Sequence, residues 1–326
     1  GTLFASSVPA RPLAVFFTFF VCVVALQMAL NLKPKPTREL PGPLGILGTG
    51  PVGCEMAQAF ARCGSEVHLV EATHGILPRE DREAAQVVQS ALERDGVRLL
   101  CCGQDLTVAN APEGVRLRLE SHGRACDVVV DRLLVAAGRA PNVEGLGLEV
   151  AGVEYDAHGV RVDDRLRTTA PRIYACGDVC SAYKFTHAAD FQARLVLRNA
   201  LFHGRGRVGA LRIPWCTYTS PELAHVGLSP QEAETQGMAI DTFTQPLASV
   251  DRAVLDGEPA GFVRVHVRRG TDAIVGATVV AEHAGDRIAE LTLAMNAGVG
   301  LGAVGASIHP YPTQAEAIRR TGDLYQ

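Results

Sequence analysis

The chain has 326 residues, 47% of them apolar and 20% charged, which is the composition of a globular protein with about two domains. The net charge of −4 and the scattered placement of Lys and Arg exclude a basic footprint for nucleic acid, so no nucleic-acid partner is expected. The nine cysteines are odd in number and sparse, which favours reduced thiols and a cytoplasmic location.

The first part of the chain contains an uncharged apolar run at residues 13–32, LAVFFTFFVCVVALQMALNL. A helix of about 20 such residues is long enough to span a bilayer. The basic residues between 33 and 38 outweigh Arg11, so an inserted helix would leave the large C-terminal part in the cytoplasm. A signal-like or mistranslated extension is the alternative. We therefore expect residues 1–36 to form a hydrophobic N-terminal segment, a candidate membrane anchor that would touch the bilayer through residues 13–32.

The stretch 44–71, LGILGTGPVGCEMAQAFARCGSEVHLVE, predicts a strand, a tight turn, a helix and a second strand. Glycines with GxGxxG spacing suit a dinucleotide, because they allow the turn, a close approach to the pyrophosphate and close packing of helix on strand. Free N–H groups at the helix start would then meet the phosphates. The alternative is a βαβ turn without a ligand. The residues expected to contact the dinucleotide are Gly48, Thr49, Gly50, Pro51, Val52 and Gly53.

Glu71 follows the second strand of this unit. A carboxylate in that position accepts hydrogen bonds from the adenine ribose and repels a 2′-phosphate. The sequence therefore predicts NAD as a cofactor, with NADH preferred over NADPH.

The next segments alternate between helix and strand patterns. We expect a helix over 80–95, a strand over 97–102, a hairpin of 115–120 with 126–130, and a strand over 132–136 that ends in AAGRAPN. Gly138 in this motif would let the backbone come close to the ligand of the first glycine-rich turn.

The adjacent Cys101 and Cys102 admit two interpretations, a redox or metal site and a buried strand end. The second is favoured, because adjacent cysteines form strained disulfides and no histidine is near in the sequence. Cys176 and Cys180 are interpreted as packing residues, since no second pair of ligands accompanies them. No metal site is predicted.

The segment TAPRIYACGD, residues 169–178, predicts an apolar strand that delivers Gly177 and Asp178 at its carboxyl end, where α/β sheets bind ligands. The alternative is an aspartate that caps the helix expected over 191–202. From residue 213 alternating runs and two helix patterns, 286–297 and 314–320, predict an antiparallel α+β module.

These motifs together resemble the FAD- and NAD(P)-dependent pyridine nucleotide-disulfide oxidoreductases over residues 38–326. The motifs, in family order, are GTGPVGCE with Glu71, AAGRAPN, TTAPRIYACGDV, FTHAADFQA, IPWCTYTSPELAHVGLS and HPYPTQAE. The resemblance implies a Rossmann-type NAD-binding domain at 37–140, a remnant of the FAD domain at 141–208 and an α+β dimerisation domain at 209–326. It also implies a homodimer that passes hydride from NADH to FAD and on to a small-molecule electron acceptor, with Gly177 and Asp178 on the FAD.

Two family features do not occur in the sequence, a first GxGxxG for FAD and the CxxxxC redox disulfide. The leading hypothesis is therefore a member of the family that is incomplete at its N-terminus. The rival hypothesis is a non-catalytic, dimerising NAD-binding module, tethered or not to a membrane.

The family pattern HPTxxE places a histidine, oriented by a glutamate, at the active site. Matching it to this chain puts Tyr311 at the histidine position, Glu316 at the glutamate and His309 two residues before the tyrosine. Tyrosine is a poor base at neutral pH, and mercuric reductases share this feature, so that branch is favoured. His309 is a second candidate base or a loop histidine. Glu55 matches the family acid near the nicotinamide, and its alternative is an exposed glutamate at a helix start.

Overall fold

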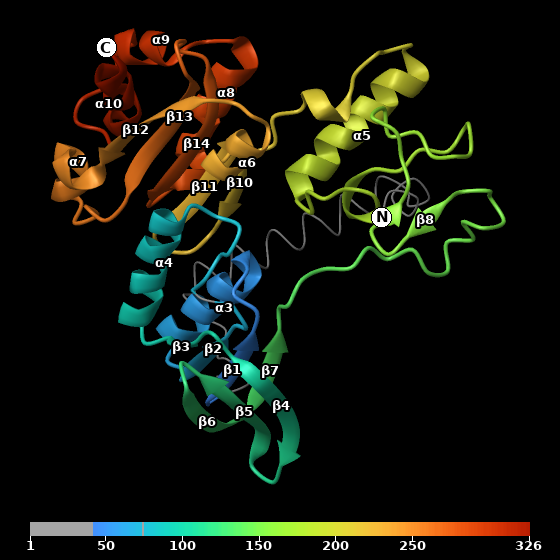
Figure 1. The fold of residues 1–326 in the computed structure, drawn as a ribbon, viewed down its shortest axis with the longest axis vertical. Helices are drawn as coiled ribbons and strands as arrows, with labels where there is room; N and C mark the ends of the chain where they lie inside the picture. Colours follow the sequence, from blue (N-terminus) through green and yellow to red (C-terminus); the bar gives the residue numbers. More distant parts are fainter. Residues whose placement is uncertain (1–41, 74) are drawn as a thin grey trace, which may run out of the picture. The chain divides into compact units, whose positions relative to one another are not determined.

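The computed structural model describes residues 42–73 and 75–326. Within these residues the strands are β1 (Leu44–Leu47), β2 (Val67–Val70), β3 (Arg98–Leu100), β4 (Gln104–Ala111), β5 (Gly114–Ser121), β6 (Arg124–Val130), β7 (Arg132–Val135), β8 (Tyr155–Asp156), β9 (Gly159–Val160), β10 (Trp215–Thr217), β11 (Glu222–Gly227), β12 (Ile240–Pro246), β13 (Phe262–Arg268) and β14 (Ile274–Ala281). The α-helices are α3 (Pro51–Arg62), α4 (Arg82–Arg94), α5 (Thr186–Leu201), α6 (Pro230–Thr235), α7 (Asp251–Leu255), α8 (Ala284–Ala297), α9 (Leu301–Ala306) and α10 (Glu316–Tyr325). Figure 1 shows their course.

The nucleotide half is built on a four-stranded sheet in the order β3-β2-β1-β7, whose neighbouring strands are parallel (Figure 1). Strands β1 and β2 are short apolar runs because helices cover a parallel sheet, which leaves little room for polar residues. Ile46 and Leu69 are fully buried, and Val88 of α4 joins them in one core. The predicted Rossmann-type unit is confirmed.

A three-stranded antiparallel sheet, β4-β5-β6, follows β3. The predicted hairpin over 115–120 and 126–130 is confirmed as β5 and β6. The strand predicted over 97–102 is shorter, because the backbone turns at Cys102, where φ is +55°. Strand β4 was not predicted, because all but the last of its side chains are exposed and give no strong apolar alternation.

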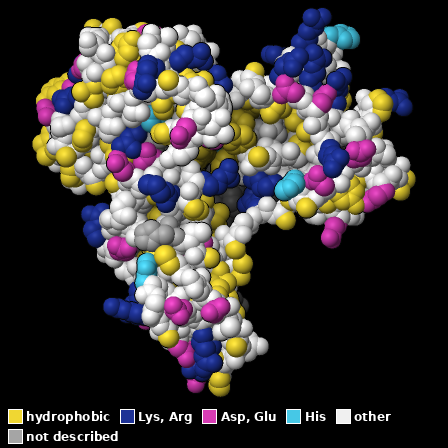
Figure 2. Space-filling model, in the orientation of Figure 1, with side chains coloured by type: hydrophobic (Ala, Val, Ile, Leu, Met, Phe, Trp, Pro, Cys, Tyr) yellow, Lys and Arg dark blue, Asp and Glu magenta, His cyan; other side chains and the backbone are white. Residues whose placement is uncertain are grey.

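The part from 141 to 208 differs most from the prediction. The strand expected within 169–178 does not form, and a single bridge joins Arg167 to Tyr174. No described strand pairs with this segment to form a ladder. Helix α5 begins at Thr186 rather than near Phe191, and it leaves apolar side chains such as Phe191 (59%) and Leu197 (55%) exposed. Figure 2 shows apolar side chains (yellow) among charged ones over the face in view.

The C-terminal module is a five-stranded antiparallel sheet in the order β10-β11-β14-β13-β12, with helices α8 and α10 packed against it. Valines of β13 and β14 are buried together with Leu291 of α8 and Ile318 of α10. The predicted antiparallel α+β module is confirmed, and its helices begin within two residues of 286 and 314. The fold class, an α/β unit followed by an α+β domain, is therefore as predicted.

Polar contacts join the nucleotide half to the C-terminal module. Trp215 Nε1 donates a 2.8 Å hydrogen bond to Glu80, which precedes α4. Arg264 of β13 pairs at 2.6 Å with Asp81, the residue that caps α4. The Gln58 side chain of α3 bonds both the N–H and the carbonyl of Ser220.

The prediction of a transmembrane protein is wrong for the part of the chain that the structure describes. No helix within residues 42–73 and 75–326 combines the length and the apolar character that crossing a bilayer requires. The run 13–32, on which the prediction depended, lies outside the described residues.

Candidate functional site

The glycine-rich turn joins β1 to α3 and leaves the helix start open. Gly50 is the N-cap of α3 and provides no side-chain hydrogen bond, and Pro51 is the first helical residue. The first turn of α3 contains no acidic side chain. The N–H groups that begin a helix have no partner within it, and the helix dipole makes this end positive. The start of α3 is therefore suited to an anion such as a pyrophosphate.

The three glycines of the turn have different structural surroundings. Gly48 has φ of +102°, and a Cβ there would lie 2.7 Å from the carbonyl oxygen of Ala136. A Cβ at Gly53 would lie 1.9 Å from the Gly48 oxygen. A Cβ at Gly50 would meet no protein atom within 4 Å. A side chain would therefore clash with the protein at Gly48 and Gly53. At Gly50 the backbone borders open space, which allows a ligand to approach it closely.

Glu71 is held between the glycine-rich turn and the loop after β2. Its Oε2 accepts from the Thr49 hydroxyl at 2.6 Å and from the Thr49 N–H at 3.1 Å. Its Oε1 accepts from the N–H groups of Ala72 and Thr73 at 2.8 and 3.2 Å. Burial by itself would raise the pKa of Glu71, but these hydrogen bonds outweigh it and hold the pKa below its usual value. The side chain therefore stays a carboxylate.

The two later motifs meet through an ion pair. Arg139 of AAGRAPN donates from Nη1 to Asp178 Oδ2 at 2.9 Å, and both side chains are largely exposed. Gly138 has φ of +115°, and a Cβ there would contact nothing within 4 Å. The turn after β7 is thus connected to the segment that carries Asp178, which lies 39 residues further along the chain.

Gly177 and Asp178 lie in a single 3₁₀ turn, Gly177–Val179. The Gly177 N–H donates to Gln192 Oε1 of α5 at 2.8 Å, and Gln192 in turn donates to Ser181 at 3.0 Å. Lys184 donates to the Asp178 carbonyl at 2.8 Å. Asp178 does not cap α5, because that helix has Phe185 as its N-cap.

Glu55 lies in α3 and accepts from the Tyr218 N–H at 2.8 Å. Burial raises the pKa of Glu55, and the hydrogen bond from Tyr218 only partly offsets this. A half-buried carboxyl with a raised pKa is suited to an active site, although here it also joins α3 to the C-terminal module.

The side chain of His309 makes hydrogen-bond contacts with two residues of its own chain. Its Nε2 lies 2.8 Å from Glu290 of α8, and its Nδ1 lies 3.0 Å from the Ser307 carbonyl oxygen. The side chain of His309 is 9% exposed. A histidine oriented by a carboxylate is a common acid–base arrangement. The glutamate here is Glu290, which the sequence did not indicate.

Tyr311 is 68% exposed and donates to Asp251 at 2.9 Å. This hydrogen bond and the charge of Asp251 raise the pKa of Tyr311, so the tyrosine remains a donor at neutral pH. Glu316 begins α10 and accepts from Arg320 at 3.1 Å. Among the described residues neither Tyr311 nor His309 shares a hydrogen bond with Glu316.

The sequence did not indicate three residues that bond the predicted site residues. They are Glu290, Asp251 and Arg139, the partners of His309, Tyr311 and Asp178. Each is a surface-type residue in a different segment from its partner, between 19 and 60 residues away. No periodicity or local motif marks such a pair.

Comparison with known proteins places these residues in a family. The profile of the pyridine nucleotide-disulphide oxidoreductases matches residues 10–193, and the dimerisation-domain profile of the same family matches 213–321. Dihydrolipoyl dehydrogenase from Thermus scotoductus is 36% identical over 87% of this chain and 62% of that protein. Mercuric reductase from Bacillus cereus is 34% identical over 89% of this chain and 45% of that protein.

Solved structures agree. The HOCl-induced flavoprotein disulfide reductase RclA from Escherichia coli superposes with a TM-score of 0.80 at 30% identity, over 89% of this chain and 66% of that one. The chain thus spans about 62% of the dihydrolipoyl dehydrogenase and less than half of the mercuric reductase. Because one family profile covers more than half of the chain and a second covers most of the remainder, the chain belongs to the pyridine nucleotide-disulphide oxidoreductase family.

Proposed function

We propose that this chain is the NAD-binding and dimerising part of an FAD-dependent oxidoreductase that takes its reducing equivalents from NADH. The observation that carries the proposal is the open position at Gly50, between an uncapped helix start and the Glu71 carboxylate. The helix start suits the pyrophosphate, and a permanent negative charge at Glu71 disfavours a 2′-phosphate. When bound, NADH supplies a hydride.

The proposed contribution of residues 141–208 is one side of a flavin site. Asp178 presents a partly exposed carboxylate, which can accept from a hydroxyl group of FAD, and Arg139 beside it can balance negative charge. The exposed apolar side chains of α5 support a further layer of protein over this part in the assembled enzyme. Gly177 remains a backbone contact to the flavin in this proposal.

For the electron acceptor we propose a small molecule, with a mercuric-reductase-like enzyme as the candidate. Tyr311 supports this branch, because its raised pKa makes it a hydrogen-bond donor rather than a base. His309 with Glu290 is the proposed acid–base pair of the same loop, Glu55 the acid on the nucleotide side, and Glu316 a positioning residue.

We further propose a homodimer formed by the C-terminal module, located in the cytoplasm. The family's dimerisation profile supports the dimer, and the odd number and sparse spacing of the cysteines in the sequence support the cytoplasmic location. The rival function, an NAD-binding module without catalysis, shares the nucleotide site. It differs in predicting no NADH-dependent flavin reduction when a complete FAD domain is supplied.

The nucleotide assignment is tested with Gly50→Ala and isothermal calorimetry. A methyl group at Gly50 meets no protein atom, so the melting temperature should stay unchanged, whereas NADH affinity should fall about tenfold or more, roughly 1.4 kcal/mol. Gly302→Ala is the matched control, since its Cβ would make only ordinary contacts in α9, far along the chain from the turn. Unchanged NADH binding by Gly50→Ala would refute the assignment.

A further inference from the structure

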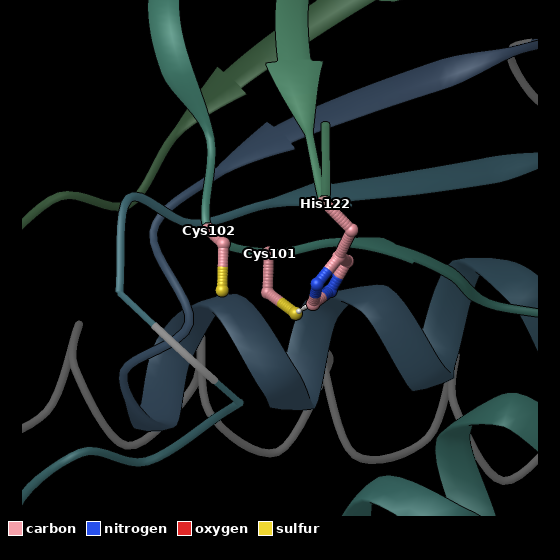
Figure 3. A group of neighbouring side chains, drawn as sticks. All are labelled: Cys101, Cys102 and His122. Atoms are coloured by element: carbon pink, nitrogen blue, oxygen red, sulfur yellow. Dashed lines mark hydrogen bonds between the residues drawn. The ribbon is translucent and has the colours of Figure 1, made fainter. Parts of the chain in front are cut away.

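Three metal-ligating side chains meet beside the nucleotide half, outside the site described above. Cys101 and Cys102 follow β3, and His122 lies in the turn between β5 and β6. Figure 3 shows the three side chains projecting to the same side of these turns. Cys101 Sγ lies 3.1 Å from His122 Nε2, and the three candidate ligand atoms all lie within 4.8 Å of one another.

Hydrogen bonds hold the two turns together without any ligand. The Ser121 hydroxyl donates to the Cys101 carbonyl at 2.7 Å, which ties the hairpin turn to the end of β3. The Cys102 N–H donates to the Thr73 carbonyl at 2.9 Å. Strands β4 and β5, which leave these turns, pair along most of their length. The donor atoms are therefore brought together by the fold and not by chance rotation of long side chains.

Two of the three residues occupy an unusual backbone conformation. Cys102 has φ of +55° and His122 has φ of +51°. Positive φ is uncommon outside glycine, and two-residue hairpin turns usually carry Asn or Gly there. In this chain the left-handed positions carry a thiol and an imidazole.

We propose that Cys101, Cys102 and His122 bind a thiophilic metal ion with a filled d shell, Zn²⁺ or Cu⁺. Two thiolates and one imidazole are ligands that these ions prefer. Tetrahedral zinc bonds of about 2.3 Å to sulfur and 2.0 Å to nitrogen place ligand atoms roughly 3.5 Å apart, so a small rotation of the side chains closes the site. Cys101 is buried, whereas His122 is exposed, so the ion can enter from solvent and keep water as a further ligand.

Metal binding would release protons. Cysteine coordinates a metal as the thiolate, so a bound ion displaces thiol protons, and two thiolates with one neutral imidazole leave a Zn²⁺ site with no net charge.

The test uses the reduced 326-residue chain and competition with a chromophoric chelator, once with Zn²⁺ and once with Cu⁺. The site predicts one ion per chain. Cys102→Ser and His122→Ala should each weaken binding by about tenfold or more. Cys101→Ser should do the same, but Cys101 is buried, so the two more accessible variants decide the outcome. Tight binding of either ion that Cys102→Ser and His122→Ala both weaken supports the proposal.

Matched controls are Cys63→Ser and Cys126→Ser, which remove thiols outside the cluster and should leave affinity unchanged. Co²⁺ gives a second readout, because its thiolate charge-transfer band should appear in the unaltered protein and weaken in Cys102→Ser. Calorimetry in buffers of different ionisation enthalpy should show proton release when Zn²⁺ binds, and less release in Cys102→Ser. No binding at micromolar concentration, or binding that the control substitutions reduce as much as Cys102→Ser does, would overturn the proposal.

Discussion

At the scale of single residues, Glu71 shows how a local pattern acquires its chemistry. The carboxylate accepts four hydrogen bonds, two from Thr49 and one each from Ala72 and Thr73. A carboxylate that accepts several backbone N–H bonds stays ionised well below neutral pH. Its negative charge is thus constant over the physiological range, so Glu71 itself adds no pH dependence to nucleotide selectivity there.

The corresponding prediction is that NADH binds at least about tenfold more tightly than NADPH, roughly 1.4 kcal/mol. Glu71→Gln keeps the shape of the side chain but removes its negative charge. The ratio of NADH affinity to NADPH affinity should therefore narrow, mainly because NADPH binds more tightly. Glu71→Arg should narrow it further or invert it. Calorimetry with both nucleotides measures the ratio. Equal affinities for the unaltered protein would rule out the role of Glu71.

At the scale of elements, two strands of the C-terminal sheet carry buried histidines, His225 in β11 and His266 in β13. His266 of β13 is fully buried, with Nδ1 2.8 Å from the Thr242 hydroxyl and no described partner for Nε2. Burial, together with nearby His225 and Arg264, lowers the pKa of His266 to about 4, while Asp81 acts in the opposite direction. Burial also lowers the pKa of His225. Both imidazoles are therefore neutral in the folded sheet at neutral pH.

A depressed histidine pKa makes stability depend on pH in a definite direction. The unfolded chain binds a proton near pH 6.5, whereas folded His266 does so only near 4, so stability is full above 6.5 and falls as the pH drops. The loss is about 1.4 kcal/mol per pH unit, or about 3 kcal/mol by pH 4. His266→Gln should flatten urea-unfolding stability between pH 4 and 6.5, and exposed His158→Gln should not. An unchanged slope in His266→Gln would contradict the assignment.

At the scale of the molecule, the C-terminal module keeps apolar side chains on its surface. Ile308, in the loop between α9 and α10, is 99% exposed, and Leu293 of α8 is 68% exposed. Their exposure agrees with the family's dimerisation profile over 213–321. In the homodimer proposed above, a second copy of the chain would cover these side chains.

Light scattering on the purified chain should therefore show a dimer. Ile308→Asp should shift the population toward monomer at micromolar concentration, because burying an unpaired charge in the interface costs several kcal/mol. Val150→Asp is the control, since Val150 is 95% exposed but lies in the 141–208 part. A monomeric unaltered chain, or equal dissociation by both substitutions, would refute this interface.

The sequence by itself determined the elements whose signals are local. Strands β1 and β2, the glycine-rich turn, the hairpin β5–β6 and the antiparallel C-terminal module follow from apolar runs, glycine spacing and turn residues within short windows. The family was likewise evident from motif order. The strand expected within 169–178 does not form, because a strand needs a pairing partner and none of the described strands pairs with this segment.

Only the tertiary structure decided which side chains meet across long separations. His122 lies 21 residues from Cys101, so the two cysteines alone indicated a buried strand end, whereas in the structure the hairpin turn adds a third candidate metal ligand. Glu290 rather than Glu316 contacts His309, because α8 packs beside the loop that carries the histidine. Hydrogen bonds act over about 3 Å and carry no record in sequence spacing, so these pairings depend on how the elements pack.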